Sequence, residues 1–217
     1  MDTLPFSKKG QDLIALYAQM ATHGYNRQDQ THVDVAFSDF ELRAYRHQLK
    51  SVLLDFNIRT VLDYGCGGSD WSAAQFDPES GQSALQYFQL QQAWRYEPAR
   101  DIDERQIADC IVSFDVLEHI FISDVPLVLR DMFSYTSRLL VLNIACYPAA
   151  AKLPNGENAH ITVRDPLWWK GMVDCISTEY PHVAVWLICS TGWRQSSDFQ
   201  RWSAGQWQES STFVTQD

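Results

Sequence analysis

A run of glycines follows directly after a short apolar segment that ends in an acid. Residues 60–64 have the composition of a buried strand, and Gly65, Cys66 and Gly67 come immediately after it. Glycine adopts positive φ readily and leaves the backbone bare, so a ligand can approach the main chain at such a strand-to-loop turn. Asp63, just before the turn, adds a negative charge. The glycines alone predict a ligand here but do not say which ligand it is.

The spacing of the glycines argues against a dinucleotide. The dinucleotide fingerprint is G-x-G-x-x-G, and its last position falls here on Asp70. Pyrophosphate is an anion held at a helix N-terminus, so a carboxylate at this position is unfavourable for it. With Asp63 and Asp70, the loop suits a positively charged ligand better.

A second acid stands at the end of the next predicted strand. Glu97 and Pro98 follow residues 93–96, and a carboxylate there can accept hydrogen bonds from both hydroxyls of a ribose. The alternative is a solvated acid at a strand end. Asp77, between Phe76 and Pro78, lies too close behind the glycines in a polar region, so Glu97 is the preferred candidate.

Two histidines are candidates for general base chemistry, because imidazole titrates near neutrality. His119 closes the segment Asp115-Val116-Leu117-Glu118-His119, which follows the strand predicted at 109–114 and so lies at the ligand-binding edge of an open sheet. The alternative for His119 is a structural histidine beside the glycine loop. His160 lies in a polar link, 153–164, that is either a lid over a substrate or an ordinary surface connection.

Strands and helices alternate along the chain in the way a parallel sheet requires. The expected helices begin or end with recognisable signals, such as the capping box that opens at Ser38 and the N-cap Asp165 before Pro166. We therefore expect an α/β fold with an N-terminal helical extension, residues 1–57, and a core, residues 58–217. The predicted helices are 8–22, 38–56, 84–91, 124–137 and one starting at 166, and the predicted strands are 60–64, 93–96, 109–114, 139–145, 183–190 and 211–214.

The composition excludes several classes of protein. Apolar residues make up 46% and charged residues 20% of the chain, and no apolar run is long enough for a membrane span. The formal charge of −10 disfavours a nucleic acid partner, because phosphate binding requires clustered Lys and Arg. Five scattered cysteines without a CxxC pair predict neither a zinc site nor a disulfide framework, and we expect no metal. The apolar stretch of a secretion signal is absent from the start, so a cytoplasmic protein is expected.

Taken in order, these motifs resemble the class I methyltransferases that use S-adenosylmethionine (SAM). The matching pieces are Leu62–Gly67, Tyr96–Pro98 and Asp115–Ile120, and the resemblance spans about residues 60–190. It implies a three-layer, Rossmann-like sheet that is mostly parallel, with antiparallel C-terminal strands and here an N-terminal helical cap. It also implies an enzyme that moves a methyl group from SAM to an oxygen or nitrogen of a small molecule and releases S-adenosylhomocysteine.

The resemblance also assigns roles to residues. It places Asp63, Tyr64, Gly65, Cys66 and Gly67 at the methionine part of SAM, Glu97 and Pro98 at the ribose, and Asp115, Val116 and Leu117 beside the methyl-donating centre. The candidate catalytic residues are His119 and His160, for the imidazole chemistry given above.

The chain departs from the family pattern after Glu97. Only 98–108 separates this strand from the next one, where the family has room for a helix, a strand and an acid near the adenine. Either this unit is reduced or the second strand lies elsewhere, and Asp101 or Asp103 is a loose candidate for the adenine side. Two alternatives stay open: a SAM- or nucleoside-binding module without catalysis, and a nucleotide-dependent oxidoreductase, against which Asp70 counts.

Overall fold

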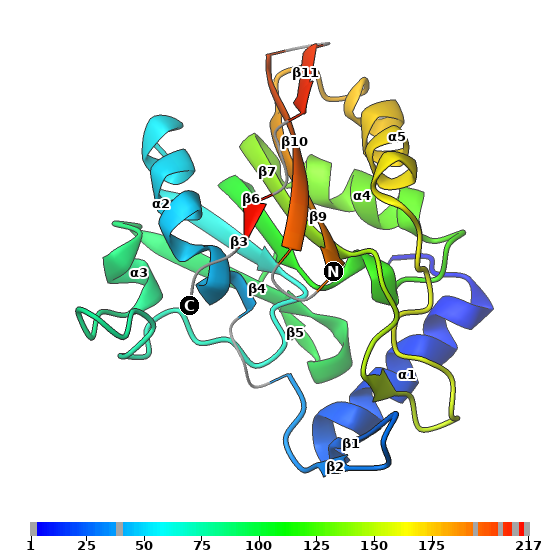
Figure 1. Ribbon diagram of the computed structural model, residues 1–217. Coiled ribbons are helices and arrows are strands. Elements are labelled where there is room, and N and C mark those ends of the chain that lie inside the picture. The colour runs from blue at the N-terminus through cyan, green and yellow to red at the C-terminus, as the bar shows by residue number, and fades with distance from the viewer. Residues whose placement is uncertain (1–3, 38–40, 193–194, 204–205, 210–212, 215–217) are drawn as a thin grey trace.

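The protein has a mixed α/β fold around one mostly parallel sheet (Figure 1). The computed structural model describes residues 4–37, 41–192, 195–203, 206–209 and 213–214. The strands of the large sheet run in the order β11-β10-β9-β7-β6-β3-β4-β5, with β12 beside β10. Its parallel centre consists of β3 (Thr60–Tyr64), β4 (Gln92–Glu97), β6 (Ala108–Phe114), β7 (Thr136–Ala145) and β9 (Ala184–Gly192).

Antiparallel strands extend both edges of this centre. At one edge β10 (Gln195–Ser203) pairs with β9, and β11 (Gln206–Glu209) and β12 (Phe213–Val214) pair with β10. At the other edge the two-residue β5 (Ile102–Asp103) pairs with β4. The expected antiparallel end of the sheet is therefore confirmed, and the second predicted strand, β4, is followed only by a 3-10 turn and the short β5 before β6.

Helices cover both faces of the sheet because its strands are apolar on both sides, as buried parallel strands are. Alternate residues face opposite clusters: Leu62 belongs to the cluster that contains α4 (Val125–Ser134) and α5 (Pro166–Ser177), whereas Val61 belongs to the cluster of α2 (Arg46–Asp55) and α3 (Ala84–Tyr87). The two pairs of helices lie on opposite sides of the strands in Figure 1.

The N-terminal segment divides into two parts that pack differently. Helix α1 (Lys8–His23) and the strands β1 (Tyr25–Arg27) and β2 (His32–Val33) form a separate cluster, in which β8 (Ala151–Lys152) pairs with β1. Helix α2, by contrast, packs onto the sheet. The division of the chain at residue 57 stays a prediction.

Most of the predicted elements are confirmed within a few residues, and the differences have local causes. Helix α3 ends at Tyr87 rather than Gln91, because Gln89 has positive φ. The predicted helix start at Ser38 lies outside the described residues; Glu41–Tyr45 forms a 3-10 turn, and α2 begins at Arg46. Within the described part of the chain, no helix is both long and apolar enough to span a membrane.

Candidate functional site

The order of the strands creates a switch point in the sheet. From β3 the chain first adds β4 on one side, and then returns to add β6, β7 and β9 on the other side. The loops that leave β3 and β6 therefore separate, and ligands of open α/β sheets bind in the crevice at the carboxyl ends of such strands. A cavity of about 540 Å³ lies here, within the usual range for small-molecule sites. Its wall is completed by α1 and by the segment 147–160.

The glycine loop approaches its neighbours so closely that side chains would not fit. Gly65 has φ +80°, and a Cβ atom there would lie 2.3 Å from Cγ2 of Val116. Gly67 has φ +53°, and its Cβ would lie 3.0 Å from Cβ of Phe37. The loop is fixed to the neighbouring strand, since the backbone N–H groups of Gly65 and Cys66 both donate to the carbonyl of Tyr96. Glycine is therefore required by the conformation and by the space.

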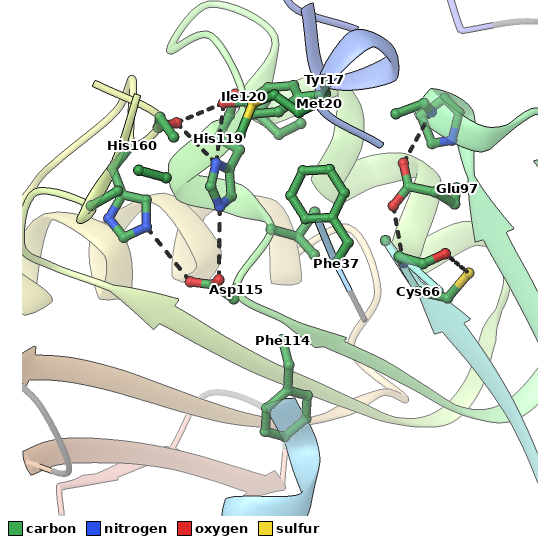
Figure 2. A pocket seen from close by; sticks show the side chains of 18 of the residues that line it. Tyr17, Met20, Phe37, Cys66, Glu97, Phe114, Asp115, His119, Ile120 and His160 are labelled. Atoms are coloured by element: carbon green, nitrogen blue, oxygen red, sulfur yellow. Dashed lines mark hydrogen bonds and ion pairs between the residues drawn. The ribbon is translucent and has the colours of Figure 1, made fainter. Parts of the chain in front are cut away.

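Glu97 ties the end of β4 to this loop. Its Oε2 accepts a hydrogen bond from the backbone N–H of Gly67 at 3.1 Å, and its Oε1 accepts one from Ala99 at 3.0 Å (Figure 2). A carboxylate offers about four acceptor positions, so each oxygen can accept one more bond from a ligand in the cavity. The predicted position of Glu97 beside the glycine loop is found in the structure.

Asp63 forms hydrogen bonds with two side chains that follow the glycine loop. Its Oδ2 accepts hydrogen bonds from the hydroxyl of Ser69 at 2.6 Å and from the indole N–H of Trp71 at 2.9 Å. Burial raises the pKa of Asp63 to about 6 against these two hydrogen bonds. Burial likewise raises the pKa of Glu97, against the hydrogen bonds from Ala99 and Gly67. We call Asp63–Gly67 together with Glu97 the glycine-loop end of the cavity.

The other end of the cavity holds two histidines and an aspartate. Oδ2 of Asp115 lies 3.9 Å from Nε2 of His119, and its Oδ1 lies 3.7 Å from Nε2 of His160. The two imidazole rings meet edge to face, with their centroids 4.9 Å apart. Figure 2 shows both rings turned towards Asp115, with Phe37 between this group and Glu97. We call Asp115, His119 and His160 the imidazole end.

Backbone carbonyls orient both imidazoles. Nδ1 of His119 lies 2.9 Å from the carbonyl of Ala159, and Nδ1 of His160 lies 2.5 Å from that of Tyr147. A carbonyl only accepts, so each Nδ1 carries a proton, and each Nε2 faces Asp115. Burial and then the neighbouring His119 lower the pKa of His160, although Asp115 opposes this shift. His160 is therefore neutral near pH 7.

Two carboxyl groups of the 115–119 turn lie close together. Glu118 is fully buried, and its Oε1 accepts a hydrogen bond from the backbone N–H of Ala145. Burial and then the charge of Asp115 hold the pKa of Glu118 well above its usual range. Burial also raises the pKa of Asp115, but His119 and His160 outweigh it and lower the value to about 2. Asp115 is thus the ionised member of the pair.

The turn itself requires an unusual backbone at Asp115. This residue has φ +58°, in the left-handed region that asparagine and aspartate tolerate better than most residues. Its N–H donates to the carbonyl of Asn143 at 3.1 Å, which anchors the turn to β7. The side chain remains 41% exposed and so stays accessible from the cavity.

The structure brings nearly all the predicted site residues to one cavity. The exception is Leu117, whose side chain is buried in the core beside α4 and does not line the cavity. The rejected acid Asp77 forms a buried ion pair with Arg46, and Asp103 pairs with Arg105, so neither contributes to the lining. The residues that do line it are Asp63, Tyr64, Gly65, Cys66, Gly67, Glu97, Pro98, Asp115, Val116, His119 and His160.

Several lining residues were not expected from the sequence. Tyr17 has the spacing of a core residue of α1, yet its hydroxyl donates to the carbonyl of Ala159 at 2.6 Å and lies 3.1 Å from Nδ1 of His119. Phe37 supplies aromatic surface between the two ends, and Phe114 also lines the cavity. By contrast, Trp168 and Trp169 lie away from the cavity, and Trp169 is a core residue, as its helical spacing indicates. Only the three-dimensional arrangement identifies Tyr17.

The charge of the lining is asymmetric. Asp63, Glu97 and Asp115 all face the cavity, whereas Arg27 is the one arginine or lysine among the described lining residues.

Comparison with models of known protein families gives no match, and comparison with curated proteins gives none either.

Proposed function

We propose that this chain is a SAM-dependent methyltransferase of the class I type that transfers a methyl group to an oxygen or nitrogen of a small molecule. The observation that carries the proposal is Glu97, bound to the Gly67 N–H at the switch point of the sheet with acceptor positions left for a ribose. In this proposal the helices on the two faces of the sheet are the outer layers of a Rossmann-like fold.

The charges of the cavity support SAM over a dinucleotide. SAM carries a sulfonium and an ammonium group, and the lining presents three carboxylates against one arginine. A pyrophosphate needs free N–H groups at the loop, but the Gly67 N–H donates to Glu97 and the Gly68 N–H donates to the carbonyl of Phe37. The loop therefore has few free N–H groups with which to bind an anion, whereas the acidic side chains beside it favour a cation.

The cavity also has room for an acceptor beyond the cofactor. In the proposal the methionine part of SAM lies along residues 63–67, which leaves Asp115, His119 and His160 at the far end to contact the acceptor. The acceptor atom forms a bond to the methyl carbon while the carbon–sulfur bond breaks and its electron pair goes to sulfur. The leaving group is already activated, so alignment and help with the acceptor's proton are what the protein must supply.

Calorimetry with SAM, S-adenosylhomocysteine and NAD tests the proposal. We expect the first two to bind and NAD not to bind. Replacing Glu97 by Gln removes a charged acceptor of ligand hydrogen bonds, worth about 1.5–3 kcal/mol, so the affinity for SAM should fall by about 10- to 100-fold.

The matched control is Glu179→Gln, which changes an exposed glutamate paired with Arg130 and should leave SAM binding unchanged. If SAM does not bind at high micromolar concentration and Glu97→Gln makes no difference, the proposal fails. Release of S-adenosylhomocysteine when fractions of a cell extract are offered as acceptors separates an enzyme from a module that only binds the cofactor.

A further inference from the structure

The imidazole end has the geometry of a metal site rather than of a hydrogen-bonded cluster. The separations of 3.9 Å and 3.7 Å between the Asp115 oxygens and the two Nε2 atoms are too long for hydrogen bonds. Two ligands about 2.1 Å from a tetrahedral ion lie about 3.4 Å apart, so each of these two separations is within about 0.5 Å of that spacing. All three ligand atoms lie within 4.8 Å of one another, so the widest pair has to close by up to roughly 1.4 Å to bind one ion.

The protonation of the imidazoles fits ligands. In metal sites, each ligating histidine donates its other ring N–H to a carbonyl or carboxylate, which fixes the tautomer and aims the free nitrogen. His119 does this towards Ala159 and His160 towards Tyr147. The described residues form no hydrogen bond to either Nε2. The two histidines come from separate segments of the chain, yet each donates its Nδ1 proton to a backbone carbonyl and directs its Nε2 towards Asp115.

In the described part of the chain, the ionised Asp115 has no lysine or arginine beside it. Among the described ion pairs it contacts only the two histidines, at 3.9 Å and 3.7 Å. Behind it, Oε2 of the fully buried Glu118 has no hydrogen-bond partner among the described residues. A buried polar atom normally has a partner, and a divalent ion on Asp115 would place a positive charge beside both groups.

We propose that Asp115, His119 and His160 bind one divalent metal ion of the zinc class, with Glu118 positioning Asp115 from behind. Two imidazoles and one carboxylate suit zinc, iron or cobalt, whereas magnesium and calcium prefer oxygen ligands only. Three protein ligands leave at least one position of the ion open to the cavity, which is the pattern of catalytic rather than structural zinc. This proposal replaces the expectation, drawn from the cysteines, that no metal is bound.

The metal site narrows the acceptor if the methyltransferase proposal holds, on which this step rests. An acceptor hydroxyl bound at the open position loses its proton more easily, and the proton goes to solvent because both imidazoles are occupied as ligands. The oxygen then forms the bond to the methyl carbon, and the carbon–sulfur bond breaks with its electrons going to sulfur. An oxygen acceptor is therefore favoured over a nitrogen acceptor.

Zinc titration of the chelator-treated protein tests the site without any cofactor or turnover. We expect one Zn²⁺ per chain, measured by competition with a chromogenic chelator. Asp115→Ala, His119→Ala and His160→Ala should each weaken binding by at least about tenfold, since even outer-shell changes have effects of that size. His160→Gln is a second variant that keeps a polar side chain, and circular dichroism establishes that each variant is folded.

Two substitutions serve as matched controls. His182→Ala removes an exposed histidine outside the cavity, and Cys175→Ser removes the exposed thiol, so neither should change zinc affinity. The proposal is overturned if the unsubstituted chain fails to bind zinc at micromolar concentration. It is also overturned if the folded His119→Ala and His160→Ala variants bind zinc as tightly as the unsubstituted chain does. SAM is titrated separately into the same proteins, so that failure of the metal proposal can be distinguished from failure of the methyltransferase proposal. If zinc binds and SAM does not, the metal site stands and the methyltransferase proposal fails. If SAM binds and zinc does not, the metal proposal fails.

Discussion

The two ends of the cavity are built in opposite ways. The glycine-loop end comes from the ends of adjacent strands β3 and β4, and its parts are held by main-chain contacts such as Gly65 N–H to the carbonyl of Tyr96. The imidazole end joins a turn after β6 to a loop after β7, and its orientation depends on Tyr17 from α1. The first end is fixed by the sheet itself, whereas the second depends on segments that dock onto the sheet from outside.

The comparison predicts that the imidazole end can be disabled without loss of the cofactor. We expect His119→Ala to lower methyl transfer by about 10²- to 10⁴-fold, the usual contribution of a group that assists proton loss. SAM affinity should stay within about twofold, because the glycine loop and Glu97 are unchanged. Turnover and calorimetry on the same preparation measure both effects. Equal losses in turnover and SAM affinity would show that the two ends are not separate.

The glycine-loop end is expected to fail through its backbone. Gly65→Ala places a methyl group against Val116 at positive φ, and strain and overpacking together should cost about 2–4 kcal/mol of unfolding free energy. SAM binding should be lost with it. The control is Gly171→Ala in α5, where a Cβ meets nothing within 4 Å, and which should be neutral or stabilise by up to about 1 kcal/mol. Urea unfolding compares the two, and similar stabilities would contradict the tight fit at Gly65.

The ends also differ in how acid affects ligand binding. In the free protein burial raises the pKa of Asp63 to about 6, so Asp63 takes up a proton between pH 7 and pH 5. Burial also raises the pKa of Glu97, which therefore takes up its proton at a higher pH than an ordinary glutamate. SAM is a cation and favours the ionised acids, so its affinity should fall between pH 7 and pH 5, by up to about tenfold per pH unit for each proton taken up. S-adenosylhomocysteine lacks the sulfonium charge and should respond less. Identical pH profiles for the two ligands in calorimetry would argue against carboxylates near the sulfur.

The smallest expected effect tests the docking of α1. Tyr17→Phe removes a hydroxyl that donates to Ala159 and lies beside His119. We expect a stability loss of about 1 kcal/mol and a fall in turnover of a few fold, with SAM affinity unchanged. Tyr180→Phe is the control, because its hydroxyl makes only a long, 3.5 Å contact with the carbonyl of Arg130 on an exposed surface. A turnover of Tyr17→Phe equal to that of the control would remove Tyr17 from the imidazole end.

The same contrast explains how much of the molecule the sequence predicts. Strand β3 and the glycine loop are contiguous, and the apolar strand followed by glycines predicts both. The acid at the end of β4 follows from the next strand in the same way. His160 could be recognised as a candidate but not placed, because its loop is positioned by the pairing of β8 with β1, whose residues Tyr25–Arg27 carry no strand pattern.

The sequence pattern does not predict the polar strand β10, for a similar reason. Strand β10 contains the buried residues Asp198 and Arg201, which a half-buried strand pattern excludes. The structure accommodates them through specific partners: the indole N–H of Trp186 donates to Asp198, and Arg201 donates to the carbonyl of Val183. Such pairings depend on neighbouring strands, so local composition does not reveal them.

The contact between Tyr17 and Ala159 has a consequence for the order of folding. The two residues are 142 positions apart, and closing so long a loop costs entropy that is recovered only when the contacts form. The parallel pairing of β3 with β4 closes a much shorter loop. The slow folding steps, which bring distant segments of the chain together, are therefore expected at the imidazole end. A newly made chain would therefore acquire its glycine-loop end before its imidazole end.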